Sequence, residues 1–208
     1  MDAATRDDVK TFISRVAAIG FGEALLLARQ DTLAVFGCVA APKTLLDQTP
    51  TVLVMRAAQL AEPSDLNRVV EIRALLDRFA RVEGRGSTHA TLPVPPMDIT
   101  AAWAGVQPPL DGWETQGHVD AASLREVART GAEQVQQQLP NSPGAAIVDG
   151  VRQRVWSQEI MPGVPAYAAF ALETLGFFSD EASVPMTVSG PWLRLSGTHG
   201  HVLVRNVG

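Results

Sequence analysis

The chain has 208 residues, of which 46% are hydrophobic and 19% charged, and its formal net charge is −5 at pH 7. This composition is that of an ordinary globular protein, and the length fits one large domain or two small ones. The acidic balance and the scattered arginines give no electrostatic reason to expect nucleic acid or an anionic membrane. We therefore predict that neither is a partner.

The single cysteine, Cys38, excludes an internal disulfide framework and a cysteine-rich zinc site. Its apolar neighbours favour a buried, inert thiol over a nucleophile that a distant histidine would have to activate. The N-terminus is too acidic and polar for a secretory signal, and the uncharged, largely apolar stretch at residues 160–172 is too short to span a bilayer. We expect a soluble, cytoplasmic protein.

The first half of the chain mixes helix and strand patterns. Apolar residues recur at helical spacing over 7–19, and residues 23–29 are predicted to resume a helix after a glycine break. Apolar runs over 33–41 and 51–58 predict two buried strands, which we expect to pair antiparallel. Asp31-Thr32 predicts the turn before the first of them.

Beyond the second run, Pro63-Ser64-Asp65 predicts another turn, followed by a short strand at 67–71 and a helix at 73–82. Residues 84–89, Gly-Arg-Gly-Ser-Thr-His, have the composition of an anion-binding loop. A phosphate loop follows a strand and opens a helix, whereas this segment follows a predicted helix and precedes prolines. A solvated loop that ends the helix is the favoured interpretation.

Residues 101–120 carry two of the four tryptophans, Trp103 and Trp113, in a stretch with neither helical nor strand period. Its prolines and glycines predict an irregular segment. A long ordered loop with large aromatics is either functional or a strap that joins two halves of a protein. For Trp103 we favour a structural role, pinning the loop to the core.

Three helices are predicted in the second half. The first begins after residue 119, where Ser123 with Glu126 forms a capping-box pattern and Asp120 is the competing cap. The second follows Ser142-Pro143 and runs to about residue 156. The third, 165–178, is apolar nearly all round and so is expected to be buried. Its one acid, Glu173, lies either on an exposed edge or at a buried position with a basic partner.

The C-terminal residues return to strand patterns. Residues 184–188 predict an edge strand, because Pro185 cannot donate to a central ladder. Residues 192–196 and 201–205 predict a hairpin around residues 197–200. This register places Leu195 opposite Val202, Leu193 opposite Val204, and Trp192 opposite Arg205, where a cation–π pair is expected.

Few residues combine into a recognisable catalytic or metal site. His199 and His201 resemble a metal pair, but no third ligand lies close in sequence, and zinc requires three or four protein ligands. Common hydrolase, metalloprotease, dinucleotide and phosphate-loop motifs are lacking. We predict no metal and no cofactor, and whether the chain is an enzyme stays open.

Several short segments resemble those of conserved uncharacterised actinobacterial proteins. They are Trp103-Ala-Gly-Val106 with Gly112-Trp-Glu114, Gly200-His-Val-Leu-Val-Arg205, and Phe36-Gly-Cys-Val39 with Pro50-Thr-Val-Leu53. The resemblance covers most of the chain and implies no particular activity.

The predicted fold class is α+β, with an antiparallel sheet of about five or six strands from both chain ends, packed by four or five helices. We expect one domain over 1–208, with a possible seam at 92–100 between a β-rich first half and a second half of helices and a hairpin. The two terminal hairpins are expected to join one sheet, since neither is stable alone.

The sequence is compatible with two functions. The first is a non-enzymatic binding or interaction module that self-associates, as a homodimer or other homo-oligomer. The alternative is a small hydrolase or transferase in which Glu114, His118 and His201 converge. The predicted binding residues are of the types that dominate interfaces or flank them: Trp103, Trp113, Glu114, His118, Trp192, Arg194, His201 and Arg205.

Overall fold

The computed structural model describes residues 1–44, 46–83 and 91–205. The segment 84–89, interpreted above as a solvated loop, lies outside the described residues. The chain forms two compact units: unit 1 is Met1–Val39 with Leu53–Gln107, and unit 2 is Ala40–Val52 with Pro108–Gly208. That the chain acts as a single domain stays a prediction.

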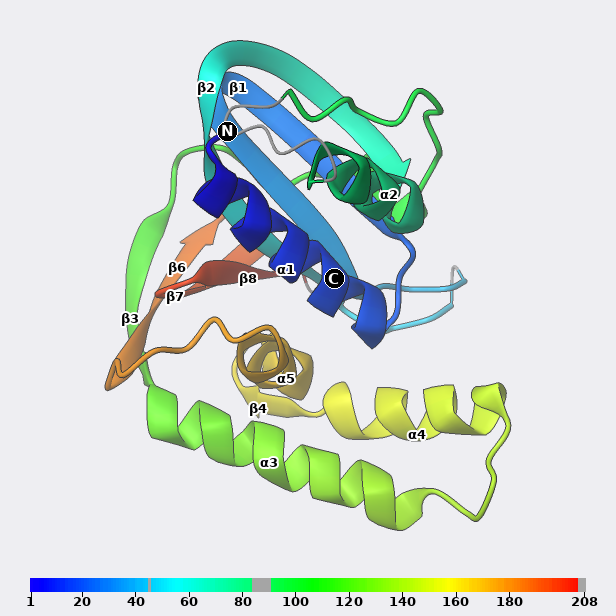
Figure 1. Cartoon of the computed structure of the whole chain (residues 1–208). Coiled ribbons are helices and arrows are strands. Elements are labelled where there is room, and N and C mark those ends of the chain that lie inside the picture. Colours follow the sequence, from blue (N-terminus) through cyan, green and yellow to red (C-terminus); the bar gives the residue numbers. More distant parts are fainter. Residues whose placement is uncertain (45, 84–90, 206–208) are drawn as a thin grey trace. The chain divides into compact units, whose positions relative to one another are not determined.

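Figure 1 shows the helices and strands and labels most of them. Their bounds are α1 (Ala3–Ile19), β1 (Glu23–Ala40), β2 (Thr51–Glu71), α2 (Ile72–Glu83), the 3₁₀ helix η1 (Ala102–Gly105), β3 (Glu114–Asp120), α3 (Ala121–Gln138), α4 (Ala145–Trp156), β4 (Glu159–Met161), β5 (Val164–Pro165), α5 (Ala166–Thr174), β6 (Ser183–Ser189), β7 (Trp192–Gly197) and β8 (Gly200–Arg205).

Six strands form one antiparallel sheet in the order β1-β2-β8-β7-β6-β3, and β4 pairs with β5 in a separate two-stranded sheet. The sheet thus draws on both ends of the chain, and the described residues form five α-helices beside it. The predicted α+β fold class is confirmed.

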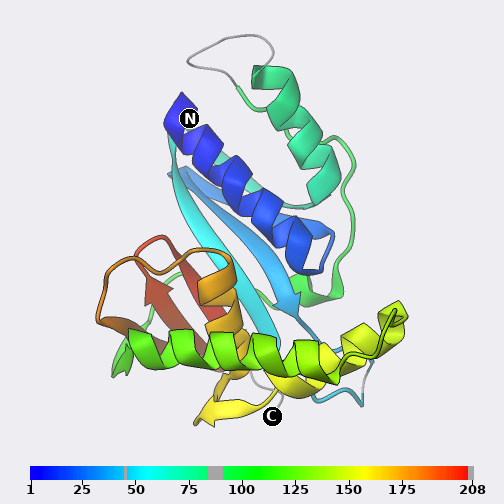
Figure 2. The same cartoon turned by 60° about the horizontal axis from the view of Figure 1, so that its bottom comes forward.

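Helix α1 confirms the prediction for 7–19 and extends it toward the N-terminus. Asp2 caps it, because its carboxylate accepts a hydrogen bond from the backbone N–H of Thr5 at 2.7 Å. The buried stripe consists mainly of apolar side chains: Val9, Phe12, Ile13, Val16 and Ile19. In unit 1, α1 and α2 contact each other and cover one face of β1 and β2 (Figures 1 and 2).

Strand β1 replaces both the helix predicted at 23–29 and the turn predicted at Asp31-Thr32. Residues 24–28 are all buried. An apolar run buried on every side carries no period that would separate a strand from a helix, which explains the wrong prediction. The strand continues through Gln30, which takes a left-handed conformation (φ 54°), so the polar residues 29–32 mark an irregularity within the strand.

Strand β2 likewise runs through the turn predicted at 63–65 and includes the strand predicted at 67–71. Residues 61–65 are all exposed, so no buried face imposes apolar alternation on them. The helix predicted at 73–82 is confirmed as α2.

Strand β3 corrects the prediction that residues 101–120 hold no regular element. It is the edge strand next to β6, and Val119 is its one fully buried side chain. Most of its side chains are exposed, and the strand is held by backbone pairing with β6, so apolar and polar residues need not alternate along it. A register shift between Thr115 and Gly117, where Gly117 has φ 141°, further hides the period.

Helix α3 starts at the competing cap, Asp120. The carboxylate of Asp120 accepts hydrogen bonds from the Ser123 hydroxyl at 2.8 Å and from its backbone N–H at 2.7 Å, and these bonds lower the pKa of Asp120. Glu126 binds Arg129 instead of the helix start, so the predicted capping box is wrong. Gly131 lies against Trp156 of α4, and an added Cβ there would come within 2.2 Å of the indole ring.

Helix α4 follows Gly144 rather than the predicted cap Ser142. Helix α5 is buried nearly all round, as predicted, and contacts α3 and β8. Glu173 is exposed at its end, so it is not a buried acid.

The C-terminal hairpin has the predicted register: Trp192 pairs with Arg205, Leu193 with Val204, and Leu195 with Val202. The strand predicted at 184–188 is β6, but it is not an edge, because β7 pairs with it on one side and β3 on the other. No helix among the described residues is both long and apolar enough to cross a membrane.

Candidate functional site

Five predicted binding residues gather on one side of the sheet in unit 2, and we call them the Trp–Arg face: Trp113, Trp192, Arg194, His201 and Arg205. The β7–β8 register puts the last four on the same face, opposite the one that carries Leu193 and Leu195. Trp113 precedes β3 and reaches the same face through its contact with Arg194.

Two stacked cation–π pairs build this face. The Arg194 guanidinium lies 4.3 Å from the centre of the Trp113 ring, and that of Arg205 lies 5.7 Å from the centre of the Trp192 ring, as predicted. Arg194 also donates to the Thr187 hydroxyl at 3.2 Å, and its partial burial lowers its pKa. Arg205 Nε is buried and has no hydrogen-bond partner among the described residues.

His201 completes the Trp–Arg face without carrying a charge at neutral pH. Burial, and then the positive charge of Arg194, lower the pKa of His201 to about 4. Its Nδ1 lies 2.9 Å from the Ser196 hydroxyl. The imidazole is therefore a neutral hydrogen-bonding group above pH 5.

Glu114 and His118 are exposed on β3 and do not converge with His201. Glu114 pairs with Val188 of β6, and His118 pairs with Pro185. Because Val188 and Pro185 are three residues apart on one strand, they point to opposite faces of the sheet, and so do Glu114 and His118. His201, on β8, is separated from β3 by two strands of the sheet. The arrangement that the hydrolase alternative requires is absent from the described residues.

Trp103 belongs to unit 1, whereas the Trp–Arg face belongs to unit 2. It is buried in η1, with 5% of its surface exposed. Its indole N–H has no partner among the residues that the structure describes. A binding role for the eight predicted residues stays a prediction.

Sequence reasoning missed a row of arginines on α2, which we call the α2 arginines: Arg73, Arg78 and Arg81. At 3.6 residues per turn they fall within an arc of about 140° on the side opposite the buried Leu75 and Phe79. Asp77 is the one acid among them. Within 1–44, 46–83 and 91–205, none of these arginines forms an ion pair.

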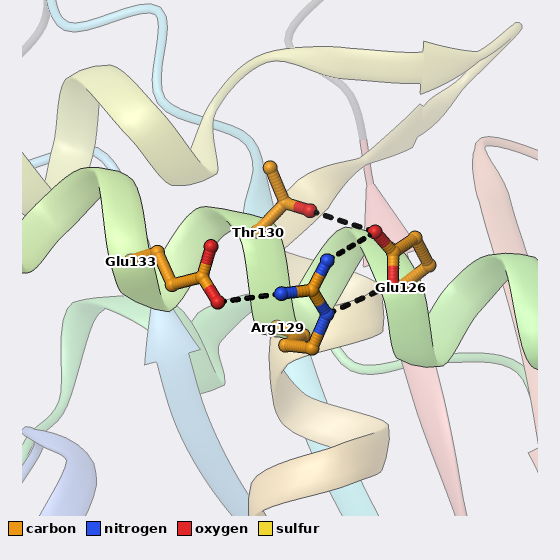
Figure 3. A network of polar contacts seen from close by, with 4 residues as sticks. All are labelled: Glu126, Arg129, Thr130 and Glu133. Atoms are coloured by element: carbon orange, nitrogen blue, oxygen red, sulfur yellow. Dashed lines mark hydrogen bonds and ion pairs between the residues drawn. The ribbon is translucent and has the colours of Figure 1, made fainter.

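The two arginines of α3 instead form hydrogen bonds with neighbouring groups. Arg129 donates to Glu126 at 2.9 and 2.5 Å and to Glu133 at 2.5 Å, and Thr130 also donates to Glu126 (Figure 3). These carboxylates raise the pKa of Arg129, while Arg129 lowers that of Glu126. Arg125 donates to the Ser179 carbonyl and covers the Phe178 ring at 4.7 Å. In the described part of the chain, the α2 arginines thus lack the carboxylate partners that Arg129 has.

No other constellation suggests chemistry. In the described part of the chain, no group of three or more His, Cys, Asp or Glu residues could hold a metal ion. Cys38 is buried in β1.

Family models cover both halves of the chain. Residues 1–105 match DUF8010 and residues 108–208 match DUF8185, each described as a domain of unknown function. The resemblance to uncharacterised proteins is thereby confirmed. No match was found among curated proteins.

The fold is similar to that of solved DNA polymerase subunits. The DNA polymerase III subunit beta from Pseudomonas aeruginosa matches 98% of the chain with a TM-score of 0.53 and 12% identity, over 63% of its own length. The pol III beta of Caulobacter crescentus matches 97% with a TM-score of 0.50 and 12% identity, over 64% of its length. A DNA polymerase sliding clamp from Pseudomonas aeruginosa matches 97% with a TM-score of 0.50 and 12% identity, over 62% of its length.

The chain therefore has a sliding-clamp-like fold and spans less than two thirds of the length of these proteins. This finding overturns two predictions: the interaction module with its hydrolase alternative, and the absence of nucleic acid among the partners. Net charge averages over the whole surface, so it does not reveal a local cluster such as the α2 arginines.

Proposed function

The chain belongs to the DUF8010 family, and we propose that it is a DNA-associated protein of sliding-clamp-like fold whose α2 arginines contact the sugar–phosphate backbone. The observation that carries this proposal is the row of α2 arginines, which have no ion-pair partner among the described residues, on a chain that matches DNA polymerase III beta subunits over 97–98% of its length.

Arginine suits this contact. Its planar guanidinium presents a fork of donors that fits phosphate oxygens, and it stays charged at any physiological pH. The apolar face of α2, with Leu75 and Phe79, is buried in unit 1, and the arginines lie on the opposite side of the helix. Contacts of this kind hold DNA without reading its sequence.

The net charge of −5 does not oppose the proposal. At physiological salt the Debye length is about 8 Å, so charges far from a bound phosphate are largely screened. The sequence of α2 holds three arginines and two acids, Asp77 and Glu83, and Glu71 ends the preceding strand β2.

The test is duplex DNA binding, measured by fluorescence anisotropy between about 50 and 200 mM salt. We expect Arg73→Gln with Arg78→Gln and Arg81→Gln to weaken binding at least tenfold, uniformly across DNA sequences. The slope of log K against log salt should fall in magnitude by about 2–3, since each phosphate contact contributes about 0.9.

The matched control removes the same number of charges elsewhere: Arg29→Gln, Arg129→Gln and Arg154→Gln. All three side chains are exposed and none belongs to α2. If the control weakens binding as much as the α2 variant, or if the wild-type protein binds without a salt dependence, the proposal is wrong.

Three further predictions are kept as proposals: a cytoplasmic location, self-association into a homo-oligomer, and an actinobacterial origin of the family. Self-association is supported by the two ends of the sheet, β1 and β3, since unpaired strand edges can pair with another chain.

A further inference from the structure

Unit 1 contains a cavity of about 380 Å³ between its two helices and its strands. Its inner wall consists of buried apolar side chains from α1, β1 and α2: Val9, Leu26, Ala28, Leu33, Val35, Leu75 and Phe79. Its mouth lies between residues 60–66 of β2 and residues 91–94.

A cavity of this size is unusual for a packing fault. Protein interiors hold few voids larger than a water molecule, and an engineered apolar cavity of about 150 Å³ already binds benzene. Ligand sites begin at about 300 Å³. At roughly 30 Å³ for each water molecule in the liquid, the cavity has the volume of about a dozen water molecules.

The lining selects against charged ligand tails. Among the described lining residues, Glu62 at the mouth has the one ionisable side chain, and Met1 also lines the cavity. A buried charge without a partner is costly, so the inner part suits an uncharged hydrocarbon.

A polar hollow of about 290 Å³ adjoins the mouth and shares Pro63 and Ser64 with the cavity. Its other walls are Arg29, Gln30 and Asp65. Arg29 and Asp65 pair with each other at 2.9 Å, so neither charge needs an ionic ligand. Gln30 and Ser64 offer uncharged donors and acceptors, and Gln30 is held in the left-handed conformation, a strain that clusters at functional sites.

We propose that unit 1 binds a single-chain amphiphile, with its alkyl chain in the apolar cavity and an uncharged, hydroxylated head in the polar hollow. The proposal is independent of DNA binding. It rests on two adjoining hollows that share Pro63 and Ser64, one walled mainly by buried apolar side chains and the other by Arg29, Gln30 and Asp65.

The experiment is isothermal titration with n-alkyl glucosides of about six to ten tail carbons, below their micelle-forming concentrations. We expect a saturable site whose dissociation constant falls about fourfold for each added CH₂, corresponding to about 0.8 kcal/mol, until the cavity is full. Alkanoates of equal chain length should bind at least tenfold more weakly. The absence of saturable binding, or equal binding of both series, would overturn the proposal.

Variants locate the site. Ala28→Leu fills the cavity from β1 and should weaken glucoside binding at least tenfold, while Ala57→Leu, on an exposed part of β2 outside the lining, should not change it. Should Ala28→Leu fail to fold, Ala61→Phe at the exposed mouth provides the same block. Ser64→Ala should weaken the glucoside several-fold and leave the n-alkanol of the same chain length unchanged. Unchanged glucoside binding in the folded blocking variant would contradict the assignment.

Discussion

His201 lies on β8 with a pKa of about 4 in the folded protein, against 6.5 for an unperturbed histidine. Burial is the larger cause and Arg194 the second. Between pH 4 and 6.5 the unfolded chain therefore binds more protons than the folded one, so the free energy of unfolding rises with pH through this window. The stability that neutral His201 contributes is complete above pH 6.5 and is lost as the pH falls toward 4.

We expect His201→Gln to remove this dependence. At pH 4 the wild-type protein should have lost about 3 kcal/mol through this group relative to pH 7, and the variant should not show that loss. Urea unfolding of both proteins from pH 4 to 7.5 measures the difference. His118→Gln, at an exposed position, is the control and should retain the wild-type slope; a wild-type slope in the His201 variant would contradict the assignment.

Helices α3 and α4 meet at a position where only a hydrogen atom fits. A Cβ added at Gly131 would lie 2.2 Å from the Trp156 ring, whereas one added at Gly150 of α4 would meet nothing within 4 Å. We expect Gly131→Ala to lower the free energy of unfolding by about 1–3 kcal/mol through overpacking. Gly150→Ala, in an exposed helix interior, should raise it by about 0.5–1 kcal/mol.

Chemical denaturation of the two glycine variants measures both effects. Because the same substitution is made in two neighbouring helices, helix propensity favours alanine in both. Opposite signs therefore isolate the contact with Trp156. If Gly131→Ala stabilises the protein as Gly150→Ala does, the close approach of α3 and α4 is wrong.

Elements were predictable where one face is buried and the other is exposed. The hairpin β7–β8 has a two-residue period and glycines at both ends of its turn, and its register followed from those features. Strand β1 is buried on every side over 24–28, and β3 is exposed almost throughout, so neither shows a period. Secondary structure that rests on neighbouring strands rather than on its own pattern could not be inferred from the sequence.

In the candidate site, too, features set by a local sequence pattern were predictable, and features set by neighbouring elements were not. The Trp192–Arg205 pair was predictable because it depends on one local register. Arg129 of α3 has two acidic partners at hydrogen-bond distance, whereas the α2 arginines have none among the described residues, and such partners are known only once the helices and their neighbours are placed. The cavity under α2 is likewise a property of packing, to which single residues give no clue.

At the scale of the whole molecule, the compact units and the family boundaries differ in one respect. The second family model covers 108–208, but unit 2 also includes 40–52. That segment is bound to α4: Gln153 donates to Thr49 at 2.5 Å and to Asp47 at 3.2 Å, and Lys43 pairs with Asp149 at 3.1 Å. Hydrogen bonds from Lys43 and Thr49 lower the pKa of Asp47.

A fragment of residues 108–208 should accordingly be incomplete. We expect it to melt at a lower temperature than the same unit in the whole chain, and a peptide of residues 40–56 added in excess should raise its melting temperature by binding the folded form. A peptide with Asp47→Ala and Thr49→Val is the control and should act more weakly. A fragment as stable alone as with the peptide would show that 40–52 is dispensable.

The path of the chain between the units also bears on how the protein folds during synthesis. Unit 1 can close once residue 107 has left the ribosome, with 40–52 excluded as a loop whose ends lie in the same unit. Thr49 and Asp47 in that loop can form their hydrogen bonds with Gln153 only after α4 has been synthesised. A protein folds its N-terminal part first when synthesis is slow relative to folding, so residues 40–52 would serve as the template on which the later unit assembles.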